Sequence, residues 1–143
     1  MAQDFTAFMA QNKIKRENVK YAASKSFVDK DGKPLLWEIK QIGNKEDEAL
    51  RKMCTRQVKV PGKPNMYRPE TDSALYMGKL AATCTVFPDL KNKELQDSYN
   101  VMGDDELLKE MLSPGEYADF CNKVSEVNGF EVDINEKVEE AKN

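Results

Sequence analysis

The sequence predicts an α+β fold, in which an N-terminal β-hairpin or small antiparallel sheet packs with a mainly helical C-terminal portion. Two runs of alternating apolar residues flank a turn-forming segment near residue 30, which is typical of a hairpin. After residue 71, apolar residues recur at helical spacing behind capping motifs. A chain of 143 residues fits one domain, so we expect residues 1–143 to form a single domain, with 131–143 as a frayed acidic tail.

The first element expected is a short N-terminal helix. Phe5, Phe8 and Met9 share one helical face, and Asp4 can cap its start. A basic stretch follows, made of Lys13, Lys15, Arg16 and Lys20. Because no aromatic residues interleave with these charges and no reading motif accompanies them, they are typical of a solvated face, and no nucleic-acid partner is expected.

The hairpin comes next. Its first strand alternates apolar with polar residues along 19–27, and its second places Leu35, Trp37 and Ile39 on one face. Between them lies Asp29-Lys30-Asp31-Gly32-Lys33-Pro34, which is dense in turn formers. The Asp-x-Asp-Gly start resembles a calcium loop, but Pro34 and Lys40 occupy the positions that require glycine and an acid. An ordinary turn is therefore expected.

A helix and a proline-rich segment follow the hairpin. Asn44 can cap the helix and Asp47 can complete a capping box, while an apolar stripe ends at Met53 and Cys54. Residues 57–70 contain three prolines and a glycine. This segment is expected to be a mobile loop with at most a short edge strand around Val58 and Val60.

The remaining elements are expected to be helices. One spans residues 71–87 and ends at Pro88, and shorter ones surround Leu95 and residues 107–112. The acidic run at 103–106 suits a helix start better than a cation site. The last helix begins at Ser113-Pro114-Gly115-Glu116, which combines an N-cap, a first-turn proline and a capping box, and it stops at Gly129.

The composition argues against several classes of function. The chain has no histidine, and its three cysteines, Cys54, Cys84 and Cys121, are far apart in sequence. We therefore expect reduced, buried thiols rather than disulfides or a metal site, no enzyme activity and no cofactor. No apolar run is long enough to span a membrane, and no phosphate loop or nucleophile elbow occurs.

Charge is distributed unevenly along the chain. Residues 1–88 carry sixteen Lys or Arg and ten Asp or Glu, whereas residues 89–143 carry six and fifteen. The two halves have opposite net charge, so the basic half of one copy can attract the acidic half of another. Self-association is therefore expected to depend on salt.

Several segments together resemble the phage XkdN-like tail assembly chaperones. The resemblance is carried by FMAQN, ENVKYAASKSFVDKDGKPLLWEIKQI, EDEALRKMCT, ETDSALYMGKLAATCTVFPDL and ELQDSYNVMGDDELLKEMLSPGEYADFCNKVSEVNGF. Each segment is unspecific alone, and their ordered succession over residues 5–130 makes the resemblance. It implies a phage or prophage protein of the host bacterial cytoplasm that binds the tape measure protein, assists assembly of tail tube protein around it, and is absent from the mature virion.

The resemblance also implies a surface for partners rather than an active site. Met66 and Tyr67 lie in the proline-rich segment, where burial is least assured, so we expect them and the exposed edge of the hairpin to contact the partner. Two other interpretations remain open. A minor structural tail or baseplate protein would occur in purified particles, and a nucleic-acid-binding protein would retain DNA or RNA in a salt-dependent manner.

Overall fold

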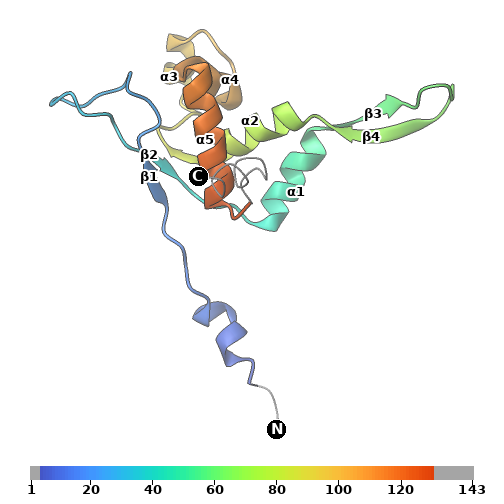
Figure 1. The fold of residues 1–143 in the computed structure, drawn as a ribbon, viewed down its shortest axis with the longest axis horizontal. Coiled ribbons are helices and arrows are strands. Elements are labelled where there is room, and N and C mark those ends of the chain that lie inside the picture. Colours follow the sequence, from blue (N-terminus) through green and yellow to red (C-terminus); the bar gives the residue numbers. More distant parts are fainter. Residues whose placement is uncertain (1–3, 131–143) are drawn as a thin grey trace, which may run out of the picture.

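The computed structural model describes residues 4–130 and has an α+β fold, as predicted. A small sheet and the helices form the body, from which a two-stranded arm and the N-terminal segment project in different directions (Figure 1). The elements in chain order are β1 (Val19–Tyr21), β2 (Trp37–Ile39), α1 (Asn44–Met53), β3 (Thr55–Lys59), β4 (Tyr67–Thr71), α2 (Ser73–Cys84), β5 (Thr85–Phe87), α3 (Lys93–Ser98), α4 (Asp104–Met111) and α5 (Pro114–Val127).

The central sheet has the strand order β1-β2-β5 and confirms the predicted antiparallel pairing, although the first strand ends at Tyr21 rather than near Phe27 and the second begins at Trp37. Strands β1 and β2 pair antiparallel, with Val19 opposite Ile39. Strand β5 corrects the sequence analysis, because the helix expected to reach residue 87 ends at Cys84. The next three residues instead pair with β2, with Phe87 opposite Glu38. Local periodicity does not reveal this change because the pairing joins residues far apart in sequence.

The turn of the β1–β2 hairpin is held by its own side chains. One carboxylate oxygen of Asp29 accepts hydrogen bonds from the backbone N–H groups of Asp31 and Lys33, at 2.8 and 3.0 Å. Gly32 adopts a positive φ of 80°, which glycine tolerates without strain. This segment is therefore a side-chain-stabilised turn, as the sequence indicates.

The core lies between the sheet and the helices. Trp37 on β2 meets Phe120 on α5 edge to face, with ring centroids 5.4 Å apart and an interplanar angle of 63°. Both side chains are almost completely inaccessible to solvent, as is Leu80 on α2. This contact joins the sheet to the last helix, and burial of the aromatic rings makes it a main contributor to stability.

Helix starts show which capping predictions hold. The Ser113 hydroxyl accepts a hydrogen bond from the Glu116 N–H, and the Glu116 carboxylate accepts one from the Ser113 N–H, so the predicted capping box is confirmed. The expected cap at Asn44 is wrong: Gly43 occupies the N-cap position of α1 and no side chain caps it. The Asp47 carboxylate is engaged elsewhere and does not close a capping box.

The acidic run before α4 forms a helix start, as expected. Asp105 is buried and pairs with Lys79 of α2 at 2.9 Å, so this carboxylate joins two helices. Burial alone raises the pKa of Asp105, but the hydrogen bond and charge of Lys79 outweigh it and hold that pKa below its ordinary value. The pair is therefore an ionic contact within the helical layer.

The N-terminal segment does not form the expected α-helix. Residues Thr6–Phe8 and Ala10–Asn12 are two single-turn 3₁₀ helices, with the Asp4 carboxylate accepting the Thr6 N–H at 2.9 Å. The Phe8 side chain is 85% exposed. A short helix gains most of its stability from packing an apolar face, and this face has nothing in the described chain to pack against.

The described residues contain no helix of the length and apolarity that a membrane span requires. The three cysteines are buried free thiols. The acidic tail expected at 131–143 lies outside the described residues.

Candidate partner-binding site

The proline-rich segment forms an ordered β-hairpin, which we call the β3–β4 arm and define as residues 55–71. It was expected to be a mobile loop, and the structure corrects this. Strands β3 and β4 pair in continuous antiparallel register, from Thr55 opposite Thr71 at the base to Lys59 opposite Tyr67 near the tip. The arm extends away from the helices into solvent (Figure 1). The prolines argued against two paired strands in this segment. Pro69 nevertheless fits within β4, because each strand of a two-stranded ribbon has a free edge where no ladder hydrogen bond is needed.

The tip of the arm is a tight loop held by backbone hydrogen bonds. The Val60 N–H donates to the Met66 carbonyl at 3.0 Å, and the Met66 N–H donates to the Lys63 carbonyl at 3.2 Å. Gly62 has a positive φ of 76°, which glycine adopts without strain. The loop sequence therefore suits the turn that closes the ribbon.

The structure places Met66 and Tyr67 together at this tip. Their side chains are 53% and 57% exposed, so the surface that the sequence analysis singled out is open to solvent. Tyr67 is the first residue of β4, and Met66 precedes it in the tip loop. Two neighbouring apolar side chains at the end of a projecting ribbon can contact a partner together.

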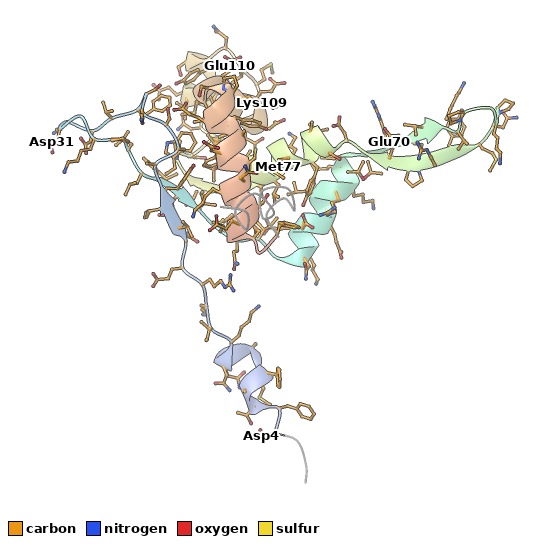
Figure 2. The ribbon with its side chains drawn as sticks, viewed as in Figure 1. Asp4, Asp31, Glu70, Met77, Lys109 and Glu110 are labelled. Carbon is orange, nitrogen blue, oxygen red and sulfur yellow. The ribbon has the colours of Figure 1, made fainter. Side chains whose placement is uncertain are left out.

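The arm is also basic. It carries four Lys or Arg side chains and the single acid Glu70, which is labelled in Figure 2. Glu70 pairs with Arg68 at 3.5 Å, between two side chains that are about half exposed. Net positive charge and two apolar groups at the tip favour a partner surface that combines apolar contacts with acidic residues.

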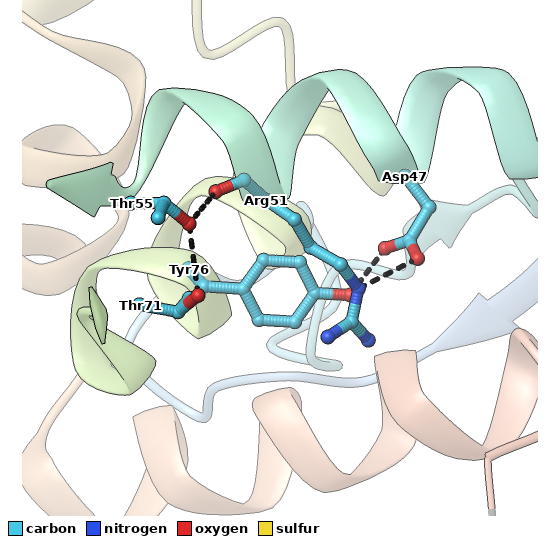
Figure 3. A network of polar contacts seen from close by, with 5 residues as sticks. All are labelled: Asp47, Arg51, Thr55, Thr71 and Tyr76. Carbon is cyan, nitrogen blue, oxygen red and sulfur yellow. Dashed lines mark hydrogen bonds and ion pairs between the residues drawn. The ribbon is translucent and has the colours of Figure 1, made fainter. Parts of the chain in front are cut away.

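Polar contacts fix the base of the arm where it leaves α1 and enters α2 (Figure 3). The Thr55 hydroxyl donates to the Arg51 carbonyl at 2.6 Å and lies 2.8 Å from the Thr71 hydroxyl. The Asp72 N–H donates to the Cys54 carbonyl at 2.8 Å and closes the ribbon. The two ends of the arm therefore stay at one place on the body.

Next to this base, Asp47, Arg51 and Tyr76 form a compact cluster. The Tyr76 hydroxyl donates to Asp47, the Arg51 guanidinium binds the same carboxylate at 3.0 Å, and it stacks 4.5 Å from the centroid of the Tyr76 ring. Burial raises the pKa of Tyr76 to about 12, assisted by its bond to Asp47. Burial also acts to raise the pKa of Asp47, but the bonds from Tyr76 and Arg51 dominate and lower it. At neutral pH the Asp47 carboxylate is therefore ionised while the Tyr76 hydroxyl keeps its proton, and the contacts among the three side chains hold α1 against α2.

The second expected contact surface, the exposed edge of the hairpin, is strand β1. It is the outer strand of the sheet and covers three residues, with Lys20 paired to Glu38 across the strands. A charged pair on a short edge strand discourages strand addition. The β3–β4 arm is therefore the better candidate. The anchor of the arm was not predicted, because Asp47 and Tyr76 are distant in sequence and the pattern around Asp47 indicated a capping box instead.

These features describe a small α+β protein with a projecting arm, and comparison with known proteins identifies its family. The model of the family described as "Phage XkdN-like tail assembly chaperone protein, TAC" matches residues 5–142. The chain is 36% identical to the phage-like element PBSX protein XkdN of Bacillus subtilis (strain 168) over 141 residues, covering 98% of this chain and 94% of that protein. The chain therefore belongs to the XkdN-like tail assembly chaperone family.

Two further similarities concern one relative. The protein YqbN of Bacillus subtilis (strain 168), described as uncharacterized, is 36% identical over 141 residues, covering 98% of this chain and 93% of that protein. A crystal structure of YqbN superposes with a TM-score of 0.77 at 33% identity, covering 92% of this chain and all of that chain. The fold described above is thus shared with a solved relative.

Proposed function

We propose that this protein acts in phage or prophage tail assembly by binding the tape measure protein through the tip of the β3–β4 arm. In this role it keeps that long protein soluble in the host bacterial cytoplasm, assists assembly of the tail tube protein around it, and leaves before the virion is complete. The observation that carries the proposal is the family match over residues 5–142. The exposed tip of the arm offers a surface that a partner can contact. This role requires no catalysis.

The arm has the properties that such binding needs. An isolated two-stranded ribbon is marginally stable in water, so an ordered, solvent-exposed ribbon gains stability when a partner covers one of its faces. The Tyr67 ring offers a large apolar contact at low entropic cost, and Met66 adapts its shape to different surfaces. A client with many similar apolar segments is best held by such an adaptable tip.

Co-expression with the tape measure protein of the same phage or prophage tests the proposal. We expect that protein to be soluble and to co-purify only when this chain is present. The variant Met66→Ser/Tyr67→Ser is expected to lose most of the co-purified partner. Met102→Ser is the matched control, because Met102 is 95% exposed but lies between α3 and α4, outside the arm.

Three outcomes contradict parts of the proposal. If the long protein is soluble alone and nothing co-purifies, the chaperone role is wrong. Retention of the partner by the double variant, at the level of the control, shows that the tip is not the contact. Detection of the chain by mass spectrometry in purified, intact particles instead supports the alternative, a minor structural tail or baseplate protein.

A further inference from the structure

An apolar groove of about 190 Å³ opens on the body, away from the β3–β4 arm. It lies between the turn end of the β1–β2 hairpin, the end of β5, and helices α3 and α4. The side chains that form its walls include Phe27, Leu35, Trp37, Phe87, Tyr99 and Met111. Phe87 is 54% exposed, and Leu36 and Val86 beside these residues are also exposed. A concave, almost wholly apolar surface of this kind is typical of a binding site.

The N-terminal segment, residues 4–18, carries apolar side chains that no other part of the described chain covers. Every residue from 4 to 18 is exposed, with Phe5 at 63%, Phe8 at 85% and Ile14 at 87%. None of these residues contributes to the hydrophobic core of the described chain. Each large apolar side chain left in water forfeits the stabilisation that its burial would contribute. The segment is therefore expected to gain stability from a surface that covers it.

The segment leads away from the groove of its own chain. Figure 2 shows Asp4 and Glu110 of α4 at opposite ends of the molecule, and α4 forms one wall of the groove. Residues 13–18 connect the segment to β1 without regular structure. To occupy its own groove, the segment would have to reverse direction and pass back along the sheet. A second copy offers the same groove without this reversal.

We propose that the N-terminal segment of one copy docks in the α3–α4 groove of a second copy, with the Phe8 ring inserted and Phe5 and Met9 against the rim. A cavity of about 150 Å³ accommodates a benzene ring, so the groove is large enough for one phenyl side chain. Reciprocal exchange of the two segments closes a twofold dimer and leaves no unpaired groove.

Charge complementarity supports this occupant. Residues 13–16 carry three basic side chains directly after the apolar stretch. Residues 89–111, which include α3 and α4, carry seven acidic and three basic side chains. Asp89, Glu94 and Glu110 each adjoin a groove residue in sequence, are exposed, and form no ion pair within residues 4–130. An approaching basic segment thus meets a net negative charge along this part of the chain.

Sedimentation of the full chain over a range of concentrations tests the proposal, which does not depend on the proposed function. Wild type is expected to shift from monomer to dimer, with weaker association in high salt because the rim charges are screened. The segment variant Phe5→Ser/Phe8→Ser is expected to weaken dimerisation at least about tenfold. Met53→Ser is the control, since Met53 is 65% exposed on α1, and it should dimerise like wild type.

A mixing experiment separates segment exchange from any other interface. The groove variant Phe87→Lys should also weaken self-association, with circular dichroism confirming that it remains folded. When the two variants are mixed, the groove variant supplies an intact N-terminal segment and the segment variant supplies an intact groove. The two should therefore form a heterodimer in which one segment is docked in one groove. A wild type that stays monomeric, a segment variant that dimerises like wild type, or a mixed pair that does not associate overturns the proposal.

Discussion

The hydroxyl groups of Thr55 and Thr71 lie 2.8 Å apart, at the point where the two strands of the β3–β4 arm leave the body. The Thr55 hydroxyl also reaches the Arg51 carbonyl near the end of α1. One side chain therefore links the helix, the first strand and the second strand. Whether the arm stays ordered along its length depends on this base, because the two strands make no contact with the core beyond it.

We expect Thr55→Val to loosen the arm without unfolding the body. The substitution removes hydrogen bonds to Arg51 and Thr71, which together contribute on the order of 1 kcal/mol. Native-state hydrogen exchange should show faster exchange of the arm amides, with little change in α2 and α5. Thr71→Ser is the matched control, because it retains the hydroxyl. Equal acceleration of exchange in the core would contradict a local role for this base.

Acid should weaken the contact between α1 and α2. Because the folded-state pKa of Asp47 is lowered, its ionised carboxylate contributes stability above the unfolded value of 3.8, and this contribution is lost as pH falls through the folded pKa. Asp47→Asn is therefore expected to be less stable than wild type in urea at pH 7, with the difference shrinking toward pH 3. A difference that stays constant between these pH values would show that the carboxylate charge is not the cause.

Gly78 on α2 lies close to Tyr117 on α5, so we expect a larger residue at position 78 to destabilise the protein. A Cβ at this position would lie 3.0 Å from the Tyr117 hydroxyl, which is tighter than nine in ten such contacts, so the Tyr117 side chain would have to shift. Gly78→Ala should therefore lose the roughly 1 kcal/mol that alanine normally adds within a helix, and should be destabilising overall. Gly115→Ala, where nothing lies within 4 Å, is the control.

A second substitution distinguishes the clash at Gly78 from other causes. Tyr117→Phe removes the hydroxyl that the new methyl group would meet. In a double-mutant cycle, Gly78→Ala should be less destabilising in the Tyr117→Phe background than in wild type. Chemical denaturation of the four proteins measures this difference. Simple additivity of the two changes would place the strain elsewhere.

The Trp37–Phe120 contact should dominate the stability of the body. Phe120 is completely buried, so Phe120→Ala is expected to lower the free energy of unfolding by about 3–5 kcal/mol. Trp37 is the only tryptophan and lies in the same contact, so its fluorescence reports unfolding directly. Phe130→Ala, at a side chain that is 41% exposed, should cost much less. Similar losses for the two variants would contradict this assignment of the core.

Sequence patterns predicted the elements whose causes are local. The capping box from Ser113 to Glu116 and the turn at Asp29 depend on residues a few positions apart, and both are confirmed. The prediction of a helix through Phe87 is wrong after Cys84. The apolar residues of Thr85-Val86-Phe87 continue the helical spacing, but these three residues pair with β2 and form a strand. The N-terminal helix forms only as two single 3₁₀ turns, because an apolar stripe alone does not supply a surface to pack against.

The sequence indicated the residues of the candidate site but not the ribbon that carries them. The exposure of Met66 and Tyr67 followed from the prolines around them, and the structure confirms that exposure. The same prolines argued against strands, whereas the ribbon forms because Pro69 needs no ladder hydrogen bond at a free edge. Whether Met66 and Tyr67 bind a partner stays a prediction.

The closure of the β3–β4 arm by the Asp72 N–H and the Cys54 carbonyl makes the arm a modular insertion between α1 and α2. Adding or removing one residue from each strand keeps the paired register at the base, and adding two from each also keeps every side chain on its face of the ribbon. The reach of the arm can therefore change in evolution without any change in the packing of the core.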